Sequence, residues 1–302
     1  CDITTGEVLA SAGRMNPQIR FGEDLMSRVS YVMMNPGGDR ELTEAVRTAL
    51  DGLIGDLVDQ NYVVVPADTP VSRLAAAFAE GKVALVTGGS RGIGYMISQG
   101  LLQAGARVYI SARKAEACQA AAADLSQYGE CIALPADVAS QEGRQALCAA
   151  LGKAESHLHI LVNNAGAAWG ETYEAYPESA FDKLMSVNVT AVFSLTRALT
   201  PMLEAAATPK DDPARVINIG SMDGLHIPTV TGVGTYAYTA SKAAVHHLTR
   251  HLGADLARQH INVNGIAPGF FPSKMTAHWA DQADEMASAF PRGRIGTPED
   301  AA

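Results

Sequence analysis

A glycine-rich segment, Thr87-Gly88-Gly89-Ser90-Arg91-Gly92-Ile93-Gly94, lies between a short apolar run and a stretch with helical spacing. The apolar run, residues 82–86, is typical of a buried parallel strand, and residues 93–102 continue as a helix. Glycines let such a strand-to-helix turn bend sharply and approach a phosphate, where the helix start offers unpaired N–H groups. An ordinary tight turn is the alternative, which the flanking strand and helix disfavour. The segment therefore predicts an α/β, Rossmann-like fold: a doubly wound parallel sheet with helices on both faces.

The end of the next predicted strand, residues 107–111, indicates which dinucleotide would bind. Folds of this kind that take NAD place a carboxylate there for the ribose hydroxyls, and residues 108–115 contain no Asp or Glu. Ala112 stands at that position and is followed by Arg113, while Arg91 lies in the glycine segment. Two guanidinium groups suit a 2′-phosphate, so the predicted cofactor is NADP(H). The alternative is that both arginines are solvated surface charges.

A tyrosine and a lysine one helical turn apart occur in Tyr238-Thr239-Ala240-Ser241-Lys242. A free phenol has a pKa near ~10, so a neighbouring cation that stabilises phenolate would make it a better acid at neutral pH. Lys242 lies four residues after Tyr238, on the same helix face. Tyr236 has Ala240 at that spacing and is the weaker candidate. Taken alone, a tyrosine in this pattern would more often be a packing residue.

These motifs, in this order, resemble the short-chain dehydrogenase/reductase family over about residues 81–302, and most closely its NADPH-dependent 3-oxoacyl reductases. Further matches to the family pattern are Asp137-Val138 after the third strand, Asn163-Asn164-Ala165-Gly166 after the fourth, Asn188 in a helix, Ser221 after the fifth strand, and Pro268-Gly269 in the nicotinamide loop.

The resemblance implies reduction of a ketone or 3-oxoacyl group, carried by a small carbonyl compound or an acyl thioester. Tyr238 would donate the proton, Lys242 would also hold the nicotinamide ribose, Ser221 would bind the substrate carbonyl, and Asn188 would hold a water of the proton relay. The implied cofactor-binding residues are Gly88, Ser90, Arg91, Gly92, Ile93, Gly94, Arg113, Asp137, Val138, Asn164, Ala165, Gly166, Tyr238, Lys242, Pro268, Gly269, Phe271 and Ser273.

Two departures from the family pattern fall near the predicted substrate pocket. Ser221 stands seventeen residues before Tyr238, a few more than is common in the similar reductases, and residues 229–234 look like the insertion. This insertion is expected to widen or cover the pocket. Ser273 replaces the usual threonine of the nicotinamide loop and keeps a hydroxyl. Trp169, His226, Phe270 and Phe271 fall near substrate-facing positions, or are simply core aromatics.

Composition limits the other function classes. The chain has 302 residues, 47% of them hydrophobic, and a net charge of −9, which argues against nucleic acid or an anionic membrane as a partner. Its four cysteines form neither a C-x-x-C pair nor a dense disulfide framework, and the first twenty residues do not read as a signal peptide, so a cytoplasmic location is expected. Three histidines after Lys242 lack a completing Cys or acid, so no metal site is predicted. They are His246, His247 and His251.

The first part of the chain differs from the rest in composition and resembles a different protein. Residues 1–80 contain no lysine and six arginines against twelve acidic residues. Residues 1–58 resemble a fragment of the actin-like ATPase domain of corrinoid-protein reactivation factors, whose nucleotide-binding loop would lie upstream. The predicted organisation is a partial α+β segment over residues 1–60, a proline-containing junction over 61–80 and the reductase domain over 81–302.

Both ends of the chain look truncated, and the last strand of the family's sheet is expected to be missing. Its loss would leave the strand at residues 261–266 with an unpaired edge and would remove surface that the family uses for tetramers. A homo-oligomer is therefore expected for the full-length family and is doubtful for this chain. Three hypotheses compete: an NADP(H)-dependent carbonyl reductase, which leads; an inactive or interaction-only fusion of two truncated pieces; and a corrinoid-reactivation component.

Overall fold

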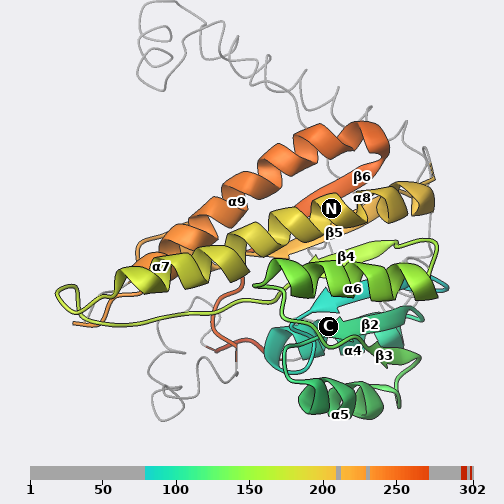
Figure 1. Cartoon of the computed structure of the whole chain (residues 1–302), viewed down its shortest axis with the longest axis horizontal. Helices are drawn as coiled ribbons and strands as arrows, with labels where there is room; N and C mark the ends of the chain where they lie inside the picture. The colour runs from blue at the N-terminus through green and yellow to red at the C-terminus, as the bar shows by residue number, and fades with distance from the viewer. Residues whose placement is uncertain (1–78, 209–211, 229–231, 272–293, 298–299, 301–302) are drawn as a thin grey trace, which may run out of the picture. The chain divides into compact units, whose positions relative to one another are not determined.

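The computed structural model describes residues 79–208, 212–228, 232–271, 294–297 and 300, and in them strands alternate with helices (Figure 1). The elements are β1 (Val83–Thr87), α4 (Gly92–Gln103), β2 (Arg107–Ser111), α5 (Ala115–Leu125), β3 (Cys131–Ala133), α6 (Gln141–Ala154), β4 (Ile160–Asn163), α7 (Glu178–Met185), η2 (Ser186–Thr190), α8 (Ala191–Ala206), β5 (Ala214–Ile219), η3 (Met222–Gly224), α9 (Tyr236–Leu256), η4 (Ala257–Gln259) and β6 (Ile261–Ile266).

The six strands form one parallel sheet in the order β3-β2-β1-β4-β5-β6. The chain runs outward from β1 in one direction and then returns to add β4 on the other side, so the order reverses between β1 and β4. In doubly wound sheets the crevice at the carboxyl ends of such a strand pair is where ligands bind. The predicted fold class is confirmed. Within the described residues β6 is an edge strand.

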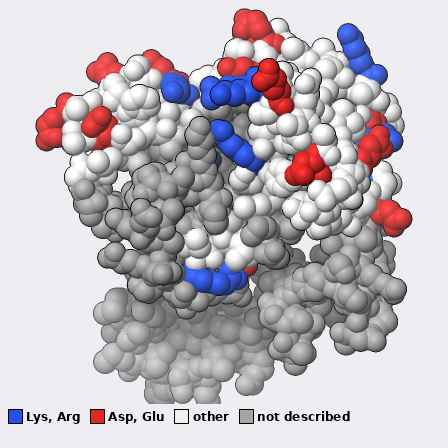
Figure 2. Space-filling view, turned by 90° about the horizontal axis from the view of Figure 1, so that it is seen from below, with Lys and Arg blue, Asp and Glu red and all other residues white. Residues whose placement is uncertain are grey.

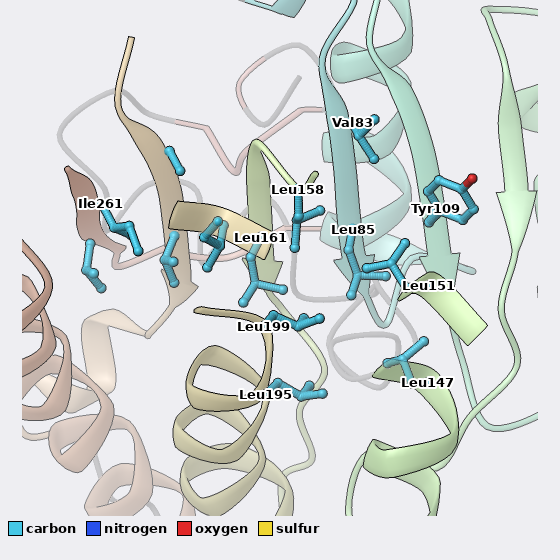
Figure 3. Close-up of a cluster of buried hydrophobic side chains, with 14 of the residues drawn as sticks. Val83, Leu85, Tyr109, Leu147, Leu151, Leu158, Leu161, Leu195, Leu199 and Ile261 are labelled. Carbon is cyan, nitrogen blue, oxygen red and sulfur yellow. The ribbon is translucent and has the colours of Figure 1, made fainter. Parts of the chain in front are cut away.

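Alternating residues of β1 supply two separate cores. Val83 and Leu85 join the cluster that includes residues of α6, α8 and α9, whereas Ala84 and Val86 join the cluster beneath α4 and α5. Figure 3 shows the first cluster, with leucines of α6 and α8 packed against strand side chains. Burial on both faces explains why this strand reads as an unbroken apolar run rather than as an alternating one.

The turn between β1 and α4 needs glycine at two positions. Gly88 has φ 70° and Gly92 has φ 56°, values in the left-handed region that other residues rarely adopt. The N–H groups of Gly88 and Gly89 donate to the Ser111 carbonyl at the end of β2, at 2.7 and 3.2 Å. The turn is therefore held over the carboxyl ends of two neighbouring strands.

The described surface carries both signs of charge. Figure 2 shows acidic and basic side chains interspersed on the described part of one face. None of the helices in the described ranges is long and apolar enough to span a bilayer. Some predictions fall outside the described residues: the segment 1–60, the junction up to residue 78, positions 229–231 of the insertion, and Ser273.

Candidate active site

The loops after β1 and β4 are locked together by one hydroxyl. Thr87 Oγ1 donates to the Val162 carbonyl at 3.3 Å and accepts from the N–H groups of Asn164 and Ala165, both at 3.0 Å. The Asn164 amide donates in turn to the Thr87 carbonyl at 2.8 Å. These bonds fix the glycine segment against the loop after β4. Thr87 was quoted in the glycine motif but was not predicted as a site residue.

Close approach of these two loops is what excludes a side chain at Gly94. A Cβ there would lie 2.3 Å from Asn164 Nδ2 and 2.5 Å from the Gly88 carbonyl oxygen. From the sequence, this glycine was expected to make room for a phosphate. The structure shows that it is already required for the packing of the protein's own loops.

The first turn of α4 has the properties of an anion site. Its N-cap residue, Arg91, makes no side-chain capping bond, and the turn contains no acidic residue. The N–H groups of the helix start thus have no side-chain acceptor at the cap, and the helix dipole favours a negative group there. Arg113 is exposed just beyond β2, and Val138 is buried beside an exposed Asp137. These residues fit a dinucleotide with a phosphorylated ribose.

Asn188 lies in a π-helical turn, η2, which joins α7 to α8. Its side chain is 2% exposed, and its amide nitrogen donates to Ser241 Oγ at 2.8 Å and to the Ala167 carbonyl at 3.0 Å. Its oxygen accepts from the Ala167 N–H at 2.9 Å. The side chain therefore ties the loop after β4 to α9. Isolated π-turns of this kind occur frequently at functional sites.

Ser221 and Tyr238 bring two hydroxyl groups together where β5 ends and α9 begins. Ser221 is 6% exposed; its Oγ accepts from the Asp223 N–H at 3.2 Å and lies close enough to the Tyr238 hydroxyl to lower the pKa of that phenol. Burial raises the pKa of Tyr238, the nearby Ser221 hydroxyl opposes that rise, and the Asp223 charge adds to it. Burial therefore sets the direction of this shift, whereas only the effect of a neighbouring cation was considered from the sequence.

Lys242 is buried next to Tyr238. Its side chain is 5% exposed, its Nζ donates to the Ile219 carbonyl at 2.7 Å, and the same atom lies 5.8 Å from the centre of the Tyr238 ring. Burial lowers the pKa of Lys242 from 10.5 to about 8, since the charged form loses its hydration. The amine is still mostly protonated at neutral pH.

Tyr176, in the loop after β4, caps the start of α9. Its hydroxyl accepts from the Ala237 N–H at 3.0 Å and donates to the Trp169 carbonyl at 3.3 Å. Thr235, the N-cap residue of α9, makes no side-chain capping bond. Tyr236 packs edge-on against Tyr176, with ring centres 5.1 Å apart. Sequence reasoning missed Tyr176, which lies in a loop with no periodic pattern.

The described end of the insertion is anchored to the same loop. Glu171 and Gly234 form an antiparallel bridge with N–H to carbonyl distances of 3.1 and 2.8 Å. Three apolar side chains close in sequence to this bridge are exposed: Trp169 near Glu171, and Ile227 and Val233 near Gly234. That the insertion shapes the substrate pocket stays a prediction.

The loop after β6 lies against the loop after β5. The Pro268 carbonyl accepts from the Met222 N–H at 3.2 Å, and the Phe270 carbonyl accepts from the Gly296 N–H at 2.8 Å. Gly269 is exposed and Phe271 is half-buried. The predicted nicotinamide loop is therefore hydrogen-bonded to Met222, the residue that follows Ser221.

His246 is the second residue that the sequence reasoning missed. It was considered only with His247 and His251, which are exposed, whereas the His246 ring contacts the backbone of Ser221. In the described ranges no group of three or more His, Cys, Asp or Glu is placed to hold a metal ion.

Strand order, glycine turn and the Ser–Tyr–Lys arrangement together define a class. The family model for short chain dehydrogenase matches residues 82–284, and the chain belongs to this family. Residues 1–71 match the family model for the RACo middle region, which confirms the resemblance to a reactivation factor.

Individual proteins similar to this chain include two reductases and a solved NADP complex. The chain is 55% identical over 225 residues to the rhamnolipids biosynthesis 3-oxoacyl-[acyl-carrier-protein] reductase of Pseudomonas aeruginosa, covering 74% of this chain and 86% of the relative. It is 36% identical to the 5-keto-D-gluconate 5-reductase of Escherichia coli over 73% and 85% of the two chains. The solved Pseudomonas aeruginosa RhlG/NADP active-site complex matches with a TM-score of 0.71 and 52% identity over 74% and 86% of the chains. The chain is an oxidoreductase homologous to a 3-oxoacyl reductase.

Proposed function

We propose that the chain reduces the ketone of a 3-oxoacyl thioester to a hydroxyl, using NADPH. The observation that carries this proposal is the placement of Ser221, Tyr238 and the buried Lys242 next to one another, at the carboxyl end of the sheet that also holds the glycine turn. The printed names of the relatives support the substrate class. A 5-ketogluconate-type sugar acid is the second candidate substrate, because one relative is a reductase for that compound.

The proposed roles follow from where each group lies. Ser221 Oγ donates a hydrogen bond to the substrate carbonyl oxygen and polarises it. The Tyr238 hydroxyl donates the proton that this oxygen needs as it becomes a hydroxyl. A raised phenol pKa keeps Tyr238 protonated before the reaction, and the Lys242 ammonium stabilises the phenolate that remains afterwards. Asn188 holds the loop after β4 in place and is the proposed anchor for a water that returns the proton.

Binding of the cofactor is proposed for the groups predicted from the sequence. The N–H groups at the start of α4 would hold the pyrophosphate, and Arg91 with Arg113 would hold the 2′-phosphate. NADPH supplies the hydride when bound. Lys242 would hold the nicotinamide ribose, and the loop at Pro268 would lie beside the nicotinamide.

We also propose a division of the chain at the junction over residues 61–80, with the partial segment 1–60 contributing little to the reductase. Matches to the two family models on either side of residues 72–81 support this division. The corrinoid-reactivation hypothesis covers only the first part of the chain. A cytoplasmic location and, in the full-length family, a homo-oligomer remain proposals of the same kind.

The experiment is NADPH oxidation by the full chain with a 3-oxoacyl thioester, 5-ketogluconate and no substrate. Tyr238→Phe keeps the ring and removes the proton donor, so turnover should fall by at least ~10²-fold while NADPH binding is unchanged. Tyr236→Phe, two residues away, is the matched control and should retain turnover. Equal turnover of Tyr238→Phe and the parent would refute the mechanism. If the parent binds NADPH but reduces neither substrate, the result would support the hypothesis of an inactive fusion instead.

A further inference from the structure

Three side chains on successive turns of α9 reach the segment where β5 ends. Tyr238, Lys242 and His246 are spaced at i, i+4 and i+8, on one side of the helix. Tyr238 lies beside the Ser221 hydroxyl, Lys242 bonds the Ile219 carbonyl, and His246 bonds the Ser221 backbone. The first two have proposed roles in the reaction. The third has none so far.

The His246 ring can hold the Ser221 peptide in either neutral form. Its Nε2 lies 2.9 Å from the Ser221 carbonyl oxygen and 3.3 Å from the Ser221 nitrogen. With a proton on Nε2 the ring donates to the carbonyl; without one it accepts from the N–H. One hydrogen bond between this nitrogen and the Ser221 backbone therefore exists in both tautomers.

Glycines on both sides of Ser221 let the loop close around the ring. A Cβ on Gly220 would lie 2.2 Å from His246 Cε1, and a Cβ on Gly224 would lie 2.9 Å from His246 Cδ2. Side chains at these positions would force the loop and the ring apart. Residues 220–224 thus pack closely against α9, with the His246 ring nearest to Gly220 and the backbone of Lys242 and Ala243 nearest to Gly224.

The opposite side of this loop is held by β6 and the loop that follows it. The Gly220 N–H donates to the Ile266 carbonyl at 2.7 Å, and the Met222 N–H donates to the Pro268 carbonyl at 3.2 Å. On the α9 side, the Ser221 backbone is held by His246. Loss of the ring would remove that hold while the bonds to the β6 side remain.

We infer that His246 is a positioning residue, which fixes the Ser221 peptide and thereby holds the Ser221 hydroxyl against Tyr238. The inference rests on the proposed reductase function. His246 acts through Ser221, so its effect on turnover requires the Ser221 hydroxyl to be present.

A double-mutant cycle in the full chain tests this dependence. His246→Ala should lower kcat by ~10–100-fold, the loss expected when a reacting group is misplaced by about 1 Å, with NADPH affinity unchanged. In a Ser221→Ala background the same change should alter kcat by less than about twofold, because the group that His246 positions is gone. His247→Ala, at the adjacent exposed position, is the matched control and should match the parent.

A second variant and a second measurement guard against a folding defect. His246→Gln keeps a nitrogen or oxygen able to bond the Ser221 backbone and should retain more turnover than His246→Ala. Amide hydrogen exchange of residues 220–224 should be faster in His246→Ala than in the parent, whether or not a substrate is reduced. Unchanged kcat in His246→Ala, or an equal fold loss with and without Ser221, would overturn the inference. A parent inactive towards ketones would instead count against the proposed function.

Discussion

Replacing Lys242 with methionine should stabilise the cofactor-free chain while abolishing its activity. The charged amine is 5% exposed, and burial lowers its pKa from 10.5 to about 8. Each pKa unit corresponds to about 1.4 kcal/mol, so burying the charge costs about 3 kcal/mol at neutral pH. Loss of the 2.7 Å bond to the Ile219 carbonyl offsets about 1 kcal/mol of the gain. Lys242→Met should therefore raise the unfolding free energy by about 2 kcal/mol.

The pH dependence of this gain identifies its cause. Between pH 8 and pH 10.5 the unfolded lysine keeps its proton while the folded one loses it, so the unfolded state binds more protons and the stability of the parent rises with pH. The advantage of Lys242→Met is then full below pH 8 and shrinks as the pH approaches 10.5.

Thermal or urea unfolding without cofactor at pH 7 and pH 10 is the measurement. At about 2–4 °C per kcal/mol, the melting temperature at pH 7 should rise by about 4–8 °C. Lys153→Met, at an exposed position of α6, is the control and should change little at either pH. A Lys242→Met variant no more stable than the parent at pH 7, or an advantage that does not change with pH, would refute the reasoning.

Three further predictions concern the cofactor and the loops. Gly94→Ala puts a Cβ 2.3 Å from a side-chain nitrogen of the neighbouring loop, so NADPH affinity should fall at least ~10-fold, as read by fluorescence titration; unchanged affinity would show that the loops can separate freely. Ala112→Asp with Arg113→Ser should shift the ratio of kcat/KM towards NADH, and the idea fails if the parent already prefers NADH. Tyr176→Phe removes the acceptor for the Ala237 N–H and should lower the melting temperature by a few degrees, about 1 kcal/mol; an equal melting temperature would mean that water replaces the cap.

Much of the fold was readable because it depends on local patterns. The strands predicted at residues 107–111 and 261–266 begin and end where β2 and β6 do, and the predicted strand at 82–86 is β1 displaced by one residue. β1 is a continuous apolar run buried on both faces, as a central parallel strand requires, whereas β6 alternates between apolar and polar residues, which suits a strand at the edge of the described sheet. In both strands the local pattern was sufficient.

The parts of the site that were missed depend on contacts between distant segments. Helical spacing is enough to place Tyr238 and Lys242 on one face, but it says nothing of how deeply they are buried. Burial decides the direction in which the pKa of each group moves, and for Tyr238 burial was not included in the prediction from the sequence. Tyr176 and His246 act on backbone groups 61 and 25 residues away in sequence, which no local pattern marks.

Because Asn188 lies in a π-helical turn, activity should depend more on the number of residues in this turn than on their identity. Removing one residue from Ser186–Thr190 would let α7 and α8 merge into one regular helix. The bulge that presents Asn188 to the Ala167 backbone and to Ser241 would then be lost. Deleting the exposed Thr190 should therefore abolish NADPH oxidation, whereas Thr190→Ala should leave it intact. Relatives that carry the same asparagine are expected to differ here by substitution and not by insertion or deletion.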